Sequence, residues 1–264
     1  MNGFSAAWLA LREPHDRRAR NAAVLDAVTS TFANHPTLNV ADIGCGTGST
    51  FRALSPHLPP GQRWRLYDND LSLLARATGA ANVTTVPLDL SHDLEAALDG
   101  AVDLVTTSAL LDLVSAAWLE RFAIEIAARR LPVYAALSYD GRVEFDPADQ
   151  LDAKIVASVN AHQRIDKGFG PALGPAAAQA AIRQFERLGY AVAQGASDWL
   201  FQAEDRDIQT EVLSGWASAS RDIGELRLTE TVGWLTRRRE LVSQGRSRIR
   251  VGHVDFFALP GAPR

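Results

Sequence analysis

Short apolar segments recur along the chain and alternate with stretches that have helical spacing. Segments 38–43, 64–67, 82–88 and 101–107 are apolar runs or alternate with period two, which predicts four strands. Residues 4–33 come before them and carry an apolar face, which predicts helices. This alternation predicts an α/β fold with a parallel sheet and right-handed crossovers.

The second half continues the pattern but contains two long additions. Segments 131–138, 190–196 and 249–259 predict the fifth, sixth and seventh strands. The first addition, 139–174, is interpreted as a long irregular loop, and such loops in compact domains are usually functional or disordered. The second addition, 202–245, contains two predicted helices.

The most informative segment joins the first strand to the helix that follows it. Glycines occur where a chain bends sharply or approaches a ligand closely, and a helix that starts there directs free N–H groups at that ligand. A dinucleotide site requires G-x-G-x-x-G, whereas this segment has an acid followed by G-x-G-x-G. It predicts a nucleotide-like ligand, with a ligand-free turn as the alternative. The segment reads Val40-Ala41-Asp42-Ile43-Gly44-Cys45-Gly46-Thr47-Gly48-Ser49.

The stretch V-A-D-I-G-C-G-T-G resembles the S-adenosylmethionine-binding loop of the class I methyltransferases. The resemblance covers 38–138 well and 175–259 in outline. It implies one Rossmann-like domain over 1–264, with N-terminal helices within 1–36. The implied α/β sheet is doubly wound, seven-stranded and mostly parallel, in the order 3-2-1-4-5-7-6 with strand seven antiparallel.

Both additions are expected on one rim of this sheet. In open α/β sheets, ligands bind beyond the carboxyl ends of the parallel strands. The 139–174 addition starts at the carboxyl end of strand five, and the 202–245 addition leaves the carboxyl end of strand six. They are therefore expected to form a helical lid that bounds the substrate pocket and excludes bulk water.

The resemblance also implies which residues hold S-adenosylmethionine. Asp68 ends the second strand about twenty residues after the glycine loop, where an acid commonly binds ribose hydroxyls, and Asp70 competes for this role. Asp89 ends the third strand, where the family commonly binds the adenine amino group; a helix cap is the alternative. The expected cofactor-binding residues are Asp42, Gly44, Cys45, Gly46, Gly48, Asp68, Asn69, Asp89, Leu90 and Ser108.

Catalytic candidates follow from the chemistry that the resemblance implies. Methyl transfer is an in-line displacement that needs alignment, and a general base helps when the acceptor is a hydroxyl or a protonated amine. His162 is the first choice for this base, because it lies within an addition beside Asp166 and Lys167. A loop histidine bonded to the backbone is the alternative. Ser108 and Asp112 follow the fourth strand and are candidates on the substrate side.

Further residues each have a functional and a structural interpretation. The polar residues of the first helices either face the site or form a solvated surface, and the tryptophans of the second addition are expected to pack. His253 is more consistent with a structural role, and the arginines of strand seven either are solvated or hold an anionic substrate. These residues are Trp8, Arg12, Asp16, Arg20, Trp199, Trp216, Trp234, Arg248, Arg250 and His253.

Composition narrows the class of protein. The net charge of −4 argues against broad nucleic-acid binding. No apolar run approaches the roughly 18 residues of a membrane span, and no signal peptide is evident, so we expect a cytoplasmic protein. The single cysteine, Cys45, excludes an internal disulfide and a multi-cysteine zinc site. No metal ligands are predicted, although the aspartates of 140–152 leave a site of the catechol-methyltransferase type open.

The leading hypothesis is a methyltransferase that uses S-adenosylmethionine and acts on a small-molecule substrate. RNA- or protein-directed methylation is the alternative, against which the acidic balance counts. The Asn/Asp-Pro-Pro-Tyr/Phe motif of many base-amino methyltransferases is missing, and Thr107-Ser108-Ala109-Leu110 stands in its place. A non-methylating S-adenosylmethionine-binding protein is a third possibility. A homodimer remains open.

Overall fold

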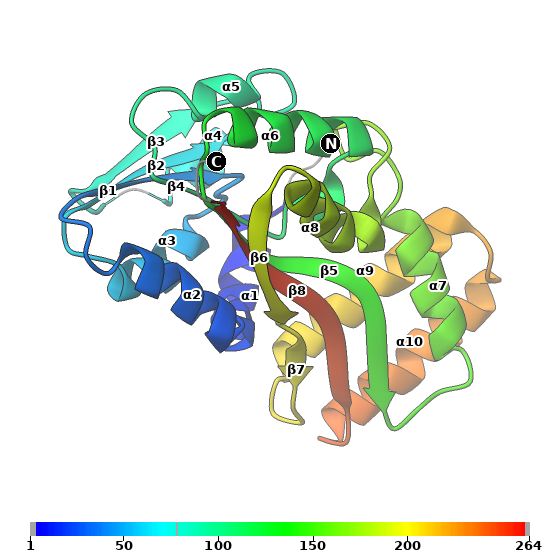
Figure 1. The fold of residues 1–264 in the computed structure, drawn as a ribbon. Helices are drawn as coiled ribbons and strands as arrows, with labels where there is room; N and C mark the ends of the chain where they lie inside the picture. The colour runs from blue at the N-terminus through cyan, green and yellow to red at the C-terminus, as the bar shows by residue number, and fades with distance from the viewer. Residues whose placement is uncertain (1–3, 78, 262–264) are drawn as a thin grey trace.

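The computed structural model describes residues 4–77 and 79–261 and shows one twisted sheet with helices on both faces (Figure 1). The strands are β1 Leu38–Ile43, β2 Gln62–Asp68, β3 Val83–Pro87, β4 Leu104–Ser108, β5 Val133–Asp146, β6 Tyr190–Ala196, β7 Trp199–Phe201 and β8 Arg248–Pro260. The helices are α1 Ala6–Ala19, α2 Ala22–Phe32, α3 Ser49–Leu54, α4 Leu71–Leu74, α5 Leu94–Ala97, α6 Ala116–Ala128, α7 Asp152–His162, α8 Ala177–Arg187, α9 Arg206–Ile223 and α10 Leu228–Ser243. Short 3-10 turns are η1 Ser55–His57, η2 Leu111–Leu113 and η3 Gly174–Ala176.

The sheet confirms the predicted α/β class and corrects the strand count. Its order is β3-β2-β1-β4-β5-β8-β6, with β8 antiparallel between β5 and β6. The predicted seven strands are therefore wrong by one, because β7 also pairs with β8 in an antiparallel ladder. β8 is long and extends past β6, and β7 pairs with the edge of β8 that would otherwise stay open.

The first addition is more regular than predicted. Instead of ending at 138, β5 runs on to Asp146, because Val143 and Phe145 alternate with exposed polar residues and pair with β8. The ladder is irregular near Gly141, whose φ of 88° is left-handed. The segment 152–162 forms α7, so the expected long irregular loop is wrong for most of this addition.

Three apolar clusters hold the described part of the molecule together. One lies between the sheet and α6 and α8 and includes Phe122 and Phe185. A second lies on the opposite face under α2 and includes Val28 and Tyr134. The third joins the outer halves of β5 and β8 to α7, α9 and α10, with Trp234 fully buried in it.

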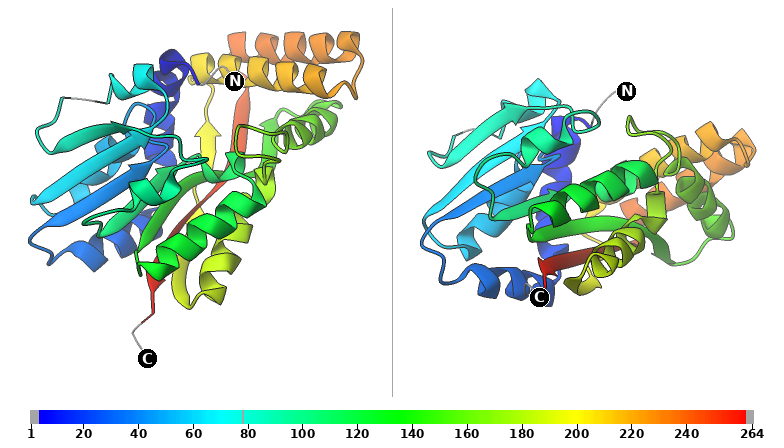
Figure 2. Two further views of the ribbon diagram at one scale, coloured as in Figure 1. Left: turned by 90° about the horizontal axis from the view of Figure 1, so that it is seen from above. Right: turned by 45° about the horizontal axis from the view of Figure 1, so that its top comes forward.

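The two additions form one unit at one end of the molecule. Figure 2 shows α9 and α10 side by side, with α7 from the first addition next to them. The fully buried Arg238 of α10 pairs with Asp152 at the start of α7 and donates to the carbonyl of Pro147 at 2.7 Å. The buried ion pair therefore joins segments that are distant in the sequence.

Candidate active site

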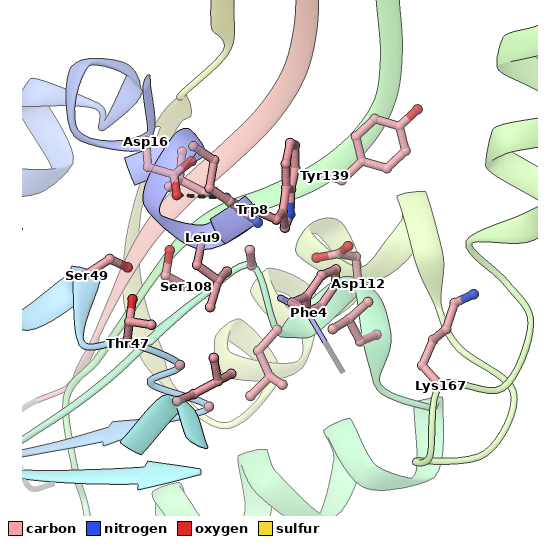
Figure 3. A pocket seen from close by; sticks show the side chains of 18 of the residues that line it. Phe4, Trp8, Leu9, Asp16, Thr47, Ser49, Ser108, Asp112, Tyr139 and Lys167 are labelled. Carbon is pink, nitrogen blue, oxygen red and sulfur yellow. Dashed lines mark hydrogen bonds and ion pairs between the residues drawn. The ribbon is translucent and has the colours of Figure 1, made fainter. Parts of the chain in front are cut away.

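A cavity of about 1200 Å³ lies at the carboxyl ends of β1, β2 and β4. The sheet forms its floor, while α1 crosses it from one side and α7 and α9 wall it from the other. Figure 3 shows Thr47, Ser49 and Ser108 at one end and Tyr139 and Lys167 at the other. We refer to these as the glycine-loop end and the outer end.

The glycine loop forms part of the cavity wall and adopts a backbone that requires its glycines. Gly44, Gly46 and Gly48 have φ values of 65°, 53° and 82°. A Cβ atom at Gly44 would lie 3.2 Å from Leu110, and one at Gly46 would lie 3.2 Å from Leu9. Neighbours from α1 and from the end of β4 thus enclose the loop, and side chains there would be strained.

Asp68 connects the end of β2 to this loop. Its Oδ2 accepts a hydrogen bond from the N–H of Gly46 at 2.8 Å, and its Oδ1 accepts from the N–H of Asp70 at 3.0 Å. Asp70 has a different task, because its Oδ1 caps α4 by accepting from the N–H groups of Ser72 and Leu73. Asp68 and Asn69 both line the cavity.

Asp42 lies beneath the loop, and its side chain is fully buried. Oδ1 accepts from the Thr106 hydroxyl at 2.7 Å, while Oδ2 has no hydrogen-bond partner among the described residues. Burial raises the pKa of Asp42 to about 7, against the opposing effects of Thr106 and Arg20. Asp42 does not line the cavity, whereas Cys45 does, and burial raises the pKa of the Cys45 thiol. This thiol is therefore not set up as a nucleophile.

Of the remaining predicted cofactor residues, some line the cavity and others do not. Leu90 and Ser108 line the cavity. Asp89 does not, because its exposed carboxylate accepts from the N–H and hydroxyl of Ser91, which also lowers its pKa. Gly48 does not line the cavity either but begins α3 as its N-cap.

Asp112 lies deep in the cavity wall, in the turn after β4. The residue is only 6% exposed, and Oδ1 has no hydrogen-bond partner in the described part of the chain. Burial raises the pKa of Asp112 to about 6, although its own N–H, Arg12 and the N–H of Tyr139 favour the charged form. In Figure 3 the carboxylate lies beside Phe4, between the two ends of the cavity.

Side chains of α1 and β7 form one wall of the cavity. The Arg12 Nε donates to Asp16 Oδ2 at 2.9 Å, and the guanidinium lies 5.0 Å from the centre of the Trp199 ring. Trp199 Nε1 donates to the other oxygen of Asp16 at 2.9 Å. Trp8, Arg12, Asp16 and Trp199 therefore face the site, whereas Arg20 is buried and donates to the Tyr134 hydroxyl at 3.1 Å.

His253 also lines the cavity and is held in one tautomer. Its Nδ1 lies 3.0 Å from the carbonyl oxygen of Val251, which can only accept, so Nδ1 carries the proton. Burial lowers the pKa of His253 to about 3, and the charge of Arg12 adds to this effect. The ring is therefore neutral, and Nε2 offers a lone pair.

Of the three predicted catalytic residues, His162 and Lys167 lie together at the cavity and Asp166 does not. His162 and Lys167 line the outer end of the cavity, with Lys167 Nζ 3.4 Å from His162 Nδ1. Asp166 does not line it, because its carboxylate accepts from the N–H groups of Gly168 and Gly170. The carboxylate near His162 is Asp222 of α9, at 3.6 Å. Burial, together with the charge of Lys167, lowers the pKa of His162.

The arginines of β8 lie outside the cavity and have acidic partners. Arg248 pairs with Asp146 at 3.5 Å, and Arg250 pairs with Asp198 at 2.6 Å. The described part of the chain brings together no three His, Cys, Asp or Glu side chains suited to a metal ion. Within 4–77 and 79–261, each helix is too short or too polar to cross a bilayer.

Comparison with known proteins finds neither a family model nor a curated sequence that matches. Solved structures do match over nearly the whole chain. A cyclopropane-fatty-acyl-phospholipid synthase-like protein from Lactobacillus casei is 13% identical, with a TM-score of 0.54 and coverage of 97% of this chain and 94% of that one. The cyclopropane synthase MmaA2 from Mycobacterium tuberculosis is 13% identical, with a TM-score of 0.53 and the same coverage. A protein from Anaeromyxobacter dehalogenans assigned as a type II methyltransferase is 15% identical, with a TM-score of 0.53 and coverage of 92% and 98%.

The chain has the fold of the class I methyltransferases. The apolar pattern of the sequence locates the strands, and therefore also the loops that directly follow them. Ser108 and Asp112 were predicted as site residues because they follow the fourth strand. The pattern missed Asp222 beside His162 and the α9 residues Glu211 and Gly215, which line the cavity. Their sequence is that of an ordinary amphipathic helix, so only the packing of α9 on the cavity reveals them.

Proposed function

We propose that this protein is a methyltransferase that uses S-adenosylmethionine and acts on a small-molecule acceptor. The observation that carries the proposal is the pairing of the left-handed glycine loop with Asp68, whose carboxylate bonds the loop and lines the cavity. A loop in which Cβ atoms would crowd Leu9 and Leu110 leaves no room for larger residues. This arrangement fits a nucleoside ligand bound against the backbone.

The cofactor would be held mainly at the glycine-loop end. Gly44, Cys45, Gly46 and Asn69 would contact it, and Asp68 would accept hydrogen bonds from the ribose hydroxyls, since each carboxylate oxygen can accept more than one. Leu90 and Ser108 would line the adenine and methionine sides. When bound, S-adenosylmethionine supplies an electrophilic methyl carbon.

Asp42, Gly48 and Asp89 would act without lining the cavity. Asp42 lies under the loop with one oxygen unpartnered, and Gly48 sets the turn into α3. Asp89 would have to release Ser91 to reach an adenine amino group. Asp42 and Gly48 would therefore shape the loop. Asp89 would contact the adenine only after a local rearrangement.

The chain contributes two acid–base candidates on the acceptor side. His162 and Lys167 lie at the outer end, where a lowered pKa keeps His162 neutral and able to accept a proton near pH 7. Asp166 would support them by holding the 168–170 turn. Asp112 lies deeper, and its Oδ1 has no hydrogen-bond partner among the described residues. The unit of α7, α9 and α10 would act as the lid.

A small acceptor is favoured by the shape of the site. The cavity lies within the fold and is bounded by α1 and α9, with 1200 Å³ to share between cofactor and acceptor. The β8 arginines that could have met a polyanion are paired with acids. Methylation of RNA or of a protein is the less favoured alternative.

The proposal is tested by incubating the purified protein with methyl-tritiated S-adenosylmethionine and fractionated cell extract. We expect label in molecules below 3 kDa, with S-adenosylhomocysteine formed in equal amount. Label only in RNA or protein fractions would favour the alternative. Binding of the cofactor without transfer in any fraction would favour a non-methylating protein.

A further inference from the structure

We propose that Asp112 and the aromatic walls of the cavity form a binding site for an organic ammonium ion. That this ligand is the methyl acceptor rests on the proposed function, but the ammonium site itself does not. The first observation is the state of Asp112: its residue exposure is only 6%, and one carboxylate oxygen, Oδ1, has no hydrogen-bond partner among residues 4–77 and 79–261. A buried polar atom without a hydrogen-bond partner is costly, so such atoms usually meet a ligand, a water or another polar group.

Among the described residues, the two cationic side chains that line the cavity are held by other partners. Arg12 donates to Asp16 and stacks on Trp199, and Lys167 lies beside His162. The charge of Arg12 and the N–H groups of Asp112 and Tyr139 act on this carboxylate, but no described residue bonds Oδ1. A positive charge from a ligand would therefore complete the environment of Asp112.

The charged side chains that line the cavity also favour a cationic ligand. Five carboxylates line the cavity against one arginine and one lysine among the described residues. Field lines from these groups concentrate within a cleft that has low-dielectric walls. The cavity therefore attracts cations and disfavours anions. The five are Asp16, Asp68, Asp70, Asp112 and Glu211.

Aromatic rings surround this part of the cavity. Half of the six tryptophans of the chain line it, and rings attract ammonium ions through their faces. One face of Trp199 already carries Arg12, which shows that this wall accommodates a cation. Figure 3 places Phe4 next to Asp112, with the Trp8 ring above them and the Tyr139 ring farther off. The aromatic lining residues are Phe4, Trp8, Tyr139, Phe169, Trp199 and Trp216.

His253 adds an acceptor for an N–H group. Its Nδ1 proton is used by the Val251 carbonyl, so Nε2 can only accept. The Tyr139 hydroxyl donates to Asn160 Oδ1 at 2.8 Å, so toward a further partner it can only accept a hydrogen bond. A ligand with several N–H donors fits these acceptors better than a carboxylate does.

The test compares three probes of similar shape and different charge. These are 2-phenylethylamine, 2-phenylethanol and 3-phenylpropionate, titrated at pH 8 into protein with and without S-adenosylhomocysteine and followed by tryptophan fluorescence. We expect the amine to bind at least about tenfold more tightly than the alcohol, and the anion to bind most weakly. Asp112→Asn should remove this preference and leave affinity for the alcohol within about twofold.

Control variants separate the site from general effects. Glu120→Gln changes an exposed carboxylate of α6 outside the cavity and should leave all three affinities unchanged. Should Asp112→Asn fail to fold, Trp8→Ala serves instead and should weaken the amine more than the alcohol. Four results would each overturn the site. The amine and the alcohol bind equally, the anion binds most tightly, no probe binds, or the folded Asp112 and Trp8 variants keep the amine preference. Binding of S-adenosylhomocysteine is recorded in the same samples, so failure of the proposed function is seen separately.

Discussion

The carboxylate of Asp68 accepts a hydrogen bond from the backbone N–H of Gly46 at 2.8 Å, across 22 residues of sequence. This bond joins the end of β2 to the middle of the glycine loop. The acid that is proposed to bind ribose therefore also fixes the backbone that is proposed to lie against the nucleoside. Loss of this side chain should disturb both at once.

Asp68→Ala should weaken binding of S-adenosylhomocysteine by about 10- to 100-fold, because it removes hydrogen bonds to a charged acceptor and loosens the loop. Asp70→Ala is the matched comparison, since Asp70 is used to cap α4. It should lower stability by about 1 kcal/mol and change binding less than fivefold. Equilibrium dialysis with labelled S-adenosylhomocysteine measures binding to both variants, and urea unfolding measures the stability of Asp70→Ala. A larger loss for the Asp70 variant would reverse the assignment of the ribose acid.

Asp42→Asn should stabilise the ligand-free protein above neutral pH. The pKa of Asp42 is raised from 3.8 to about 7 in the folded state, so the folded protein binds this proton more tightly than the unfolded chain. The carboxylate therefore costs stability progressively as the pH rises from about 4 to about 7. The amide keeps an acceptor for Thr106 and removes this cost.

Urea unfolding of both proteins at pH 4 and pH 8 measures the effect. We expect the variant to gain roughly 2–4 kcal/mol relative to the parent at pH 8 and little at pH 4. A gain of the same size at both pH values would mean that the charge of Asp42 is not its source.

The sequence was informative wherever a local pattern decided the structure. Periodic apolar segments predicted the main strands, the family resemblance implied their order, and three glycines after an acid predicted the loop that lines the cavity. β7 was not predicted, because three residues such as Trp199–Phe201 become a strand only when β8 offers an unpaired edge. The extension of β5 was missed for a related reason, since its alternation follows a left-handed Gly141 that resembles a loop signal.

Residues of the site that depend on packing could not be predicted in the same way. Asp166 lies next to Lys167 in sequence, yet its carboxylate turns back to the N–H groups of Gly168 and Gly170. Asp222 instead reaches His162 from another helix. Local spacing says nothing about such pairs, because they form only when α7 and α9 meet.

Gly215→Phe should block the acceptor while sparing the cofactor. Gly215 lies on α9 at the cavity wall, and beyond its own helix backbone a Cβ atom there would meet no atom of the described residues within 4 Å. The added ring should fill the outer end without straining the helix. Binding of S-adenosylhomocysteine should stay within about twofold, whereas methyl transfer should fall by a factor of about 100, because misplaced reactants lose alignment.

Gly233→Phe is the matched control for this variant. Gly233 is also a helical glycine, but it lies on α10 away from the cavity. Its replacement should change neither quantity appreciably. Equal rates in the two variants would show that α9 does not bound the acceptor.

Arg238→Ala should destabilise the unit of α7, α9 and α10 by roughly 3–5 kcal/mol, because it leaves Asp152 without its buried partner. Arg237→Ala removes a neighbouring but exposed pair with Asp149 and should cost less than about 1 kcal/mol. Chemical denaturation, with hydrogen exchange of α10 as a local probe, measures both. Equal losses would show that the buried pair does not join the two additions.

Calorimetric titration of S-adenosylhomocysteine into the purified protein tests the central claim most directly. The claim is that the glycine loop and Asp68 form a site for an adenosyl thioether and its sulfonium parent. The account predicts saturable binding of one ligand per chain in the micromolar range, lost in Asp68→Ala. Absence of binding heat with both S-adenosylhomocysteine and S-adenosylmethionine would contradict it.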